Sequence, residues 1–396
     1  ALIISIGSLM VFYLGLRSVF RFPVAFIATV GSGLSYYALY YAVNGRAYSL
    51  MLLCTGLAAL ALLKIYEQQE NRYWLVFILA SIAGFFAVPV FLYPFAAMVF
   101  FGAFSFFITR NRSGFFNLVL ATFFAGVATL LLYLPIMLVS GPEQLFGNEY
   151  VVRLSREVFL QKLPVYLPYT QGAVLGQETV GFYGWLAAVL LLSLLLLFRK
   201  RLRNFWQENG LTPGRVFWVW CGSVIPWLIM LGQGVLPPDR VWLFKAFFDF
   251  LLLGIAAQAT IGLVFRAQPT WWFSAAVLLT LVYGSYEVIK LRRSVQGNTI
   301  LDGPFDRNIE RIRQGGAKTV ASSEGFYAAF LRYHYLQHGQ ENLIIDEVDQ
   351  LSGQPYDVVI LEPNHLFPEA LDQADYELVH QDQFVRIFRR KPRTKN

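Results

Sequence analysis

The sequence is 396 residues long, and 56% of these residues are hydrophobic while only 14% are charged. Soluble domains carry about a quarter charged residues, so this composition, with a mean hydropathy of +0.50, excludes an ordinary soluble protein and indicates a polytopic membrane protein. The net charge of +7 does not indicate nucleic-acid binding, because the basic residues lie in short segments between apolar runs. Cys54 and Cys221 both fall within apolar runs, which favours buried free thiols over a disulfide framework.

Runs of about 20 apolar residues predict membrane-spanning helices, and the sequence contains about ten of them. They are expected near residues 1–18, 22–43, 48–66, 73–89, 90–108, 117–139, 180–198, 216–234, 242–265 and 271–290. Pro89 and Pro94 lie around the joint of the fourth and fifth runs, where a tight turn or kink is expected.

The lysines and arginines between these runs predict the orientation of the bundle, because cytoplasmic loops carry the excess of basic residues. One side is expected to hold twelve of them: Arg17, Arg21, Lys64, Arg72, Arg110, Arg112, Arg199, Lys200, Arg201, Arg203, Arg215 and Arg266. The other side is expected to hold five: Arg46, Arg153, Arg156, Lys162 and Arg240. The first side is therefore predicted to be cytoplasmic, which places the turn 44–47, the loops 140–179 and 235–241 and residues 291–396 outside. Ala1 also falls outside, so an odd number of spanning helices is expected before it in the natural protein.

The long outer loop contains a pattern of its own at residues 149–164, where apolar and polar positions alternate at near-helical spacing. Arg153 and Arg156 stand there beside Glu157. The pattern predicts an amphipathic helix on the outer leaflet, and a helix that packs over the bundle explains it equally well.

The second outer loop leads into a helix that carries three charged residues. Pro237 and Pro238 stiffen the loop, and Arg240 follows at the start of the helix. Lys245 and Asp249 lie four residues apart, so they share a helix face and are expected to pair within the apolar zone. Asp249 is expected to lie too deep to act on a substrate at the interface.

After Lys290 the composition changes sharply, which predicts a boundary between a membrane domain at 1–290 and a soluble extracytoplasmic domain at 291–396. The second domain is predicted to be a small α/β layer with mainly parallel strands and an antiparallel end. The expected elements are a helix near 305–314, a strand at 318–322, a helix at 324–338, and strands at 342–346, 356–361, 376–380 and 383–389.

The predicted second domain carries no dinucleotide-binding, P-loop or zinc-binding motif. Ser322-Ser323-Glu324 is interpreted as a helix N-cap. His334 and His338 share a helix face, but no H-E-x-x-H arrangement accompanies them, so no metal site is predicted. A histidine metal site within the membrane is excluded, because all four histidines lie in the predicted second domain: His334, His338, His365 and His380.

The turn between the second and third apolar runs resembles a known signature. It reads Tyr40-Tyr41-Ala42-Val43-Asn44-Gly45-Arg46-Ala47-Tyr48-Ser49-Leu50. The pattern Y-Y-x-x-x-x-R-x-Y-S-L before a leucine-rich helix is similar to the bacterial polyprenyl-phosphate-sugar glycosyltransferases of the GT-C superfamily. These enzymes are relatives of protein O-mannosyltransferases and of the lipid A aminoarabinose transferase, where the stretch often reads Y-Y-S-R-E-A-R-P-Y-S-L-L-L. By spacing alone, a snorkelling arginine in an aromatic belt also explains the turn.

Other stretches carry the resemblance further and also depart from it. The tail Y-E-L-V-H-Q-D-Q-F-V-R-I-F-R-R-K resembles the closing hairpin of the extracytoplasmic domain in many of these enzymes. Asn44 stands where the family has glutamate and Ala47 where it has proline. Leu92-Tyr93-Pro94-Phe95 stands where the family commonly has T-H-Y.

The resemblance implies transfer of a sugar, with inversion, from a polyprenyl-phosphate carrier to an acceptor lipid, glycan or protein at the outer face of a bacterial cytoplasmic membrane. Cations aimed at the leaving phosphate stabilise its developing charge, and this is the role implied for Arg46 and Arg240, with Lys245 as a further candidate. Tyr48 is expected to orient the headgroup or to donate a hydrogen bond to it. The family's base is an Asp or Glu in the first outer loop, which maps upstream of Ala1. No resident cofactor is expected besides the lipid-linked donor, and the sequence gives no indication of a metal requirement.

Two alternatives from other classes stay open. The chain is alternatively a non-catalytic membrane subunit that keeps the GT-C scaffold as an interaction platform in a larger complex. A transporter or flippase for lipid-linked sugars comes third. That class shows internal repeats or broken helices with polar residues at the midplane, whereas this sequence shows no repeat and its midplane charge is limited to Lys245 and Asp249.

Overall fold

A computed structural model of the chain describes residues 1–43, 47–141, 153–176, 178–265, 271–323, 325–337, 343–348, 351, 355–362, 365–381 and 385–391. The chain divides into two compact units, Ala1–Arg292 and Arg293–Asn396.

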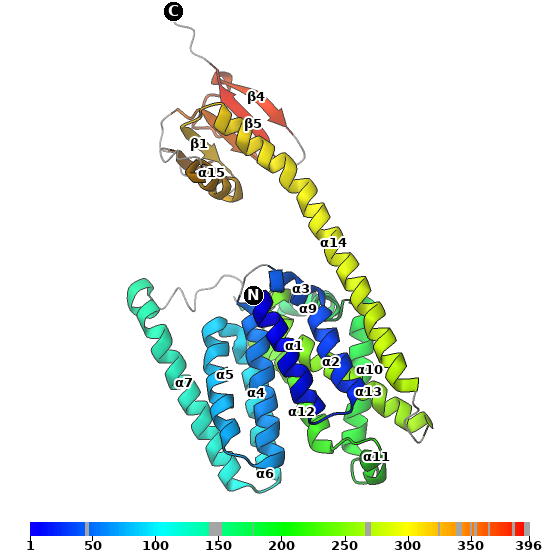
Figure 1. Cartoon of the computed structure of the whole chain (residues 1–396). Helices are drawn as coiled ribbons and strands as arrows, with labels where there is room; N and C mark the ends of the chain where they lie inside the picture. The colour runs from blue at the N-terminus through cyan, green and yellow to red at the C-terminus, as the bar shows by residue number, and fades with distance from the viewer. Residues whose placement is uncertain are drawn as a thin grey trace, which may run out of the picture. The chain divides into compact units, whose positions relative to one another are not determined.

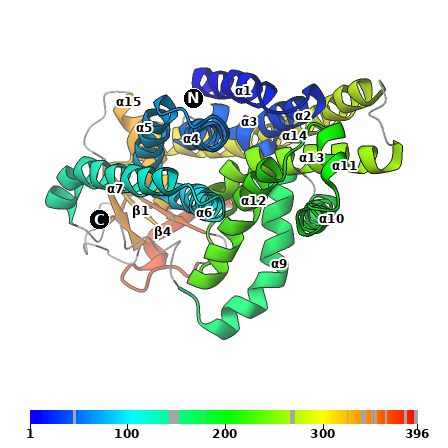
Figure 2. The same ribbon diagram turned by 90° about the horizontal axis from the view of Figure 1, so that it is seen from below.

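The first unit is a bundle of helices (Figure 1). Its helices are α1 (Leu2–Arg17), α2 (Phe22–Leu34), α3 (Tyr36–Val43), α4 (Tyr48–Gln68), α5 (Arg72–Ala87), η1 (Pro89–Phe91), α6 (Leu92–Ile108), α7 (Arg112–Ser140), α9 (Arg156–Leu175), α10 (Glu178–Leu197), α11 (Arg203–Glu208), α12 (Pro213–Gln233), η3 (Asp239–Phe244), α13 (Lys245–Phe265) and α14 (Trp271–Gln314), which continues into the second unit. Figure 1 shows α3 and α9 at one end of the bundle and α11 at the other, and Figure 2 shows α9 lengthwise where α4 and α10 are seen end-on. We call these ends the η3 end, because η3 packs on α3 and α9, and the α11 end.

The apolar runs form helices at the predicted places, which confirms the polytopic bundle. Seven helices among the described residues are long and apolar enough to cross a membrane. The pair α2 and α3 qualifies as an eighth span that is bent by 54°. The two remaining runs, α1 and α5, are shorter apolar helices of 16 residues each. Likewise, the joint at Pro89 is a turn of 3₁₀ helix, as the prolines predict.

Three predictions about element bounds are wrong. Residues 22–43 are not one straight helix, because Ser35 is extended (φ −60°, ψ 146°) between α2 and α3. The amphipathic helix does not cover 149–164 but runs over Arg156–Leu175, since Ser155 caps its start and the chain stays helical past two prolines. The helix near 305–314 is not separate, because it is the last part of the 44-residue α14.

Side-chain caps determine where several helices begin. The Asn111 side chain accepts a hydrogen bond from the N–H of Gly114 at 2.8 Å, one residue before α7. Thr212 accepts from the N–H of Arg215 at 3.2 Å, and Pro213 fills the first turn of α12. Such caps satisfy backbone donors that have no partner within the helix.

Glycines let the bundle helices approach closely. A Cβ atom on Gly222 of α12 would lie 2.2 Å from the ring of Phe248 in α13. A Cβ atom on Gly56 of α4 would lie 1.9 Å from the ring of Phe12 in α1. Both rings are fully buried, so small residues provide the close van der Waals packing that holds helices together in lipid.

The second unit contains a five-stranded sheet in the order β2-β1-β3-β5-β4. Its elements are β1 (Thr319–Ser322), α15 (Gly325–Gln337), β2 (Ile344–Glu347), β3 (Val358–Leu361), η5 (Gln373–Asp375), β4 (Tyr376–Gln381) and β5 (Arg386–Arg390). Strand β1 pairs in parallel with β2 and β3, whereas β5 runs antiparallel to β3 and β4. This arrangement confirms the small α/β layer with an antiparallel end. The central β3 is buried along its whole length, which explains its unbroken apolar sequence.

Candidate functional site

The predicted site residues fall in different parts of the bundle. Arg46 lies outside the described residues. Tyr48 opens α4, half-buried, with its ring centroid 4.6 Å from that of Tyr41 in α3. Arg240 lies half-buried in η3, whereas Lys245 opens α13 with no exposed surface. Because α3 packs on η3 and α4 follows α3 closely in the chain, Tyr48 and Arg240 belong to the η3 end.

Asp239 joins three separate elements at the η3 end. The hydroxyl of Tyr37 in α3 donates a hydrogen bond to Asp239 Oδ2, and the hydroxyl of Tyr169 in α9 donates to the same oxygen at 3.3 Å. The backbone N–H of Arg240 donates to Asp239 Oδ1 at 2.8 Å. These donors fix the first turn of η3 and therefore the backbone from which the Arg240 side chain extends.

A second set of hydrogen bonds fastens α9 to the segment around η3. Trp242 Nε1 donates to the hydroxyl of Tyr166 at 2.7 Å, and that hydroxyl donates in turn to the carbonyl oxygen of Pro237. Burial raises the pKa of Tyr166, so its phenol stays neutral and keeps the proton that it donates. The Trp242 ring also stacks on Trp227 of α12, with centroids 4.3 Å apart.

The turn before η3 depends on Gly234, which ends α12 with φ +68°, a conformation that favours glycine. Its carbonyl oxygen accepts a hydrogen bond from the N–H of Leu154 at 3.0 Å. A Cβ atom on Gly234 would lie 3.7 Å from the Arg153 side chain. Arg153, which the sequence places within a helix, therefore lies in a non-helical segment beside this turn.

Lys245 and Asp249 form the predicted ion pair, at 3.1 Å and with no exposed surface. Lys245 Nζ also donates to the carbonyl oxygen of Ser223 at 2.5 Å. Asp249 accepts from the Ser223 hydroxyl at 2.5 Å and from Gln171 Nε2 at 2.7 Å. The ammonium lies 5.3 Å from the ring centroids of Trp185 and Trp227. The pair thus lies inside a closed polar network that connects α9, α12 and α13.

Sequence reasoning missed the grouping around Asp239. It predicted Asp239 within the outer loop 235–241 but named no partner, because Tyr37 and Tyr169 are distant in the chain. Among the carboxylates of the predicted outer loop 140–179, Glu157 is exposed in the first turn of α9, while Glu143 and Glu149 lie outside the described residues. The described part of the chain contains no group of three or more metal-ligating side chains. His334 lies 3.4 Å from Glu310, and His338 is not among the described residues.

The η3 end offers chemistry suited to an anionic ligand. Arginine binds phosphate through charge-assisted hydrogen bonds, and tyrosine hydroxyls can donate to its oxygens. The site combines the half-buried Arg240, a carboxylate already engaged by hydroxyl and amide donors, and the half-buried Tyr48 at the start of α4.

Comparison with solved structures identifies a similar fold. The chain resembles the crystal structure of ArnT from Cupriavidus metallidurans bound to undecaprenyl phosphate, with a TM-score of 0.53 and 12% sequence identity. The match covers 98% of this chain and 82% of that chain. The resemblance to GT-C polyprenyl-phosphate-sugar glycosyltransferases, first indicated by the turn before Tyr48, is thereby confirmed for the fold. No family model and no curated protein sequence matches the chain.

Proposed function

We propose that this chain is a membrane glycosyltransferase that moves a sugar from a polyprenyl-phosphate carrier to an acceptor at the outer face of the membrane. The likeness to ArnT over almost the whole chain supports this proposal, because the ArnT crystal structure holds undecaprenyl phosphate. The geometry of the η3 end adds support, since Asp239 fixes the backbone of Arg240 at an end of the bundle, the depth expected of a lipid headgroup.

Arg240 is the residue to which we assign the carrier phosphate. When the sugar leaves the carrier, the phosphate gains negative charge, and a cation fixed beforehand beside it lowers the barrier. Asp239 contributes by positioning, because its hydrogen bonds to Tyr37 and Tyr169 hold the first turn of η3. Arg46 and Tyr48 remain predicted contacts of the same headgroup.

Lys245 has weaker support as a phosphate contact. Its ammonium is fully buried and already donates to Ser223 and Asp249, so reaching a ligand requires breaking both interactions. We assign it instead to the internal network. The base that deprotonates the acceptor stays a prediction for residues upstream of Ala1.

The lipid-linked-sugar transporter, the third interpretation of the sequence, gains one supporting observation. Transporters commonly bind substrate where a spanning helix is broken, and α2 and α3 form such a bent pair. A transporter moves the donor unchanged, whereas a transferase releases free polyprenyl phosphate. A donor labelled in its sugar, incubated with membranes that contain the protein, therefore distinguishes the two.

The proposal predicts that Arg240→Ala weakens binding of undecaprenyl phosphate. Loss of one charge-assisted contact corresponds to about a tenfold lower affinity, and Arg240→Lys should retain part of it. Binding is measured by titration of the purified protein in detergent. Arg156→Ala is the matched control, because Arg156 is an exposed arginine on α9 with no contact to η3 among the described hydrogen bonds and ion pairs.

Equal affinities for Arg240→Ala and the unaltered protein would contradict the assignment. A protein that binds no polyprenyl phosphate at all would favour the non-catalytic scaffold.

A further inference from the structure

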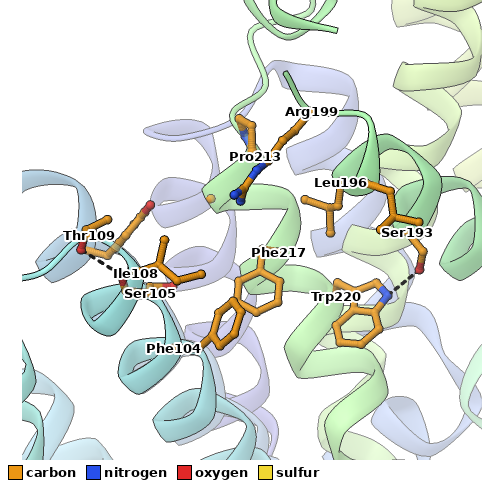
Figure 3. Close-up of a pocket in the computed structure, with 13 residues that line it drawn as sticks. Phe104, Ser105, Ile108, Thr109, Ser193, Leu196, Arg199, Pro213, Phe217 and Trp220 are labelled. Atoms are coloured by element: carbon orange, nitrogen blue, oxygen red, sulfur yellow. Dashed lines mark hydrogen bonds between the residues drawn. The ribbon is translucent and has the colours of Figure 1, made fainter. Parts of the chain in front are cut away.

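A groove opens at the α11 end of the bundle, between α6, α10 and α12 (Figure 3). Its volume is 480 Å³, within the size range of small-molecule sites in proteins. The lining is mainly apolar and includes Phe104, Ile108, Leu196, Phe217 and Trp220. In Figure 3 the rings of Phe104 and Phe217 lie together below Arg199 and Pro213.

The groove is separate from the Arg240 site. Helix α6 begins near that site, where the hydroxyl of Tyr93 donates to Gln233 Oε1 at the end of α12. It first lines the groove at Phe104, eleven residues after Tyr93. At 1.5 Å per residue this separates the two places by about 17 Å.

The groove is open at the surface of the bundle. Leu197 is 77% exposed and Ile108 48% exposed, so both present apolar side chains at this opening. Inside the groove, polar groups are paired with one another: Trp220 Nε1 donates to the Ser193 hydroxyl at 2.9 Å. An aliphatic chain in the groove therefore meets an apolar lining without leaving these polar groups unpaired.

A cation stands over this apolar lining. Arg199 borders the groove, is exposed, and forms no ion pair among the described residues. Lys200, Arg201 and Arg203 follow it and are exposed as well. At the same end of the bundle, Arg110 and Arg112 border a second hollow of 410 Å³ beside Phe107 and Phe115.

We propose that this groove binds an anionic phospholipid, with one acyl chain along the aromatic lining and the phosphate at Arg199. The ligand has to combine an aliphatic tail with an anionic head, because the groove combines an apolar lining with basic residues at its edge. Basic pockets between spanning helices on the cytoplasmic side bind acidic lipid headgroups in this way. The excess of lysine and arginine at the α11 end predicts that this end, with its groove, lies on the cytoplasmic side. This inference is independent of the function proposed above.

The test is native mass spectrometry of the delipidated full-length chain, titrated with phosphatidylglycerol or with phosphatidylethanolamine. We expect one phosphatidylglycerol to be retained more strongly than the zwitterionic lipid. Arg199→Glu should reduce that retention about fivefold or more, as expected for loss of one surface cation. Lys162→Glu is the matched control, because it makes the same charge change at an exposed residue of α9, away from the groove and its basic rim.

A second variant tests the apolar part of the site. Ile108→Trp places a larger side chain in the groove from its exposed edge and should lower retention of phosphatidylglycerol with the charge unchanged. Inorganic phosphate, which has no tail, should neither compete with the lipid nor raise the melting temperature.

Several results would overturn the proposal. Equal retention of the two lipids, or retention that Arg199→Glu and Ile108→Trp leave intact, excludes an anionic-lipid site here. Competition by inorganic phosphate would mean that the rim binds free anions only.

Discussion

Lys245 and Asp249 are full charges without exposed surface, and each depends on the other. Removing a buried charge from water costs several kcal/mol, and only a close partner with further hydrogen bonds offsets this cost. The 3.1 Å contact, the Ser223 carbonyl and the Gln171 amide provide that compensation. Loss of one charge leaves the other uncompensated in an apolar interior.

Lys245→Met is therefore expected to lower the free energy of unfolding by about 3 to 5 kcal/mol, because Asp249 loses its cation. The double variant Lys245→Met/Asp249→Leu should recover most of this loss, since no buried charge remains. Both are measured by unfolding of the purified protein in detergent. A double variant as unstable as the single one would show that the network stabilises the fold through more than charge compensation.

Among the elements, α9 illustrates how packing changes an interpretation based on periodicity. The sequence predicts an amphipathic helix over 149–164 that lies on the outer leaflet or packs over the bundle. In the structure the second half of α9 is buried at Thr170 and Gln171, and Tyr166 and Tyr169 hydrogen-bond around η3. Packing over the bundle is therefore what the structure favours for this part of the helix.

Tyr166→Phe should loosen α9 from η3. The change leaves Trp242 Nε1, on a fully buried ring, without its acceptor, which costs about 1 to 3 kcal/mol. We expect faster amide exchange in α9 around Tyr166 and a lower melting temperature, measured by hydrogen–deuterium exchange with mass spectrometry and by thermal unfolding. Tyr183→Phe, on an exposed tyrosine of α10, is the control and should change neither. Unaltered exchange in α9 would show that these hydrogen bonds do not hold the helix.

At the scale of the whole molecule, the predicted orientation can be tested by cysteine labelling, because the native cysteines are shielded from the reagent. Cys54 is 3% exposed and Cys221 is fully buried, so neither should react with a membrane-impermeant maleimide. Ser113→Cys, beside Arg112, and Glu157→Cys, on α9, place exposed thiols in segments predicted to lie on opposite sides.

In intact cells the maleimide should label Glu157→Cys, and it should label Ser113→Cys only after permeabilisation. This follows from the excess of basic residues on the side of Arg110 and Arg112. The reverse pattern would show that the bundle has the opposite orientation, with the Arg240 site at the cytoplasmic face.

The sequence by itself determined which segments are helices and which are strands. In lipid every backbone group has to bond within its own helix, so the length of an apolar run is enough to predict a span, as for α4, α10 and α13. The Lys245–Asp249 pair was likewise predictable, because a spacing of four residues places both on one helix face. Short runs rich in valine and isoleucine similarly predicted strands of the second unit.

Only the tertiary structure decided which residues meet. Tyr37, Tyr169 and Asp239 come from three elements far apart in the chain, and no local period relates them. The bend at Ser35 and the groove beside Arg199 likewise follow from no period of the sequence. The periodicity of a sequence specifies the face that each helix buries, whereas the partner of that face depends on contacts between distant segments, which periodicity does not encode.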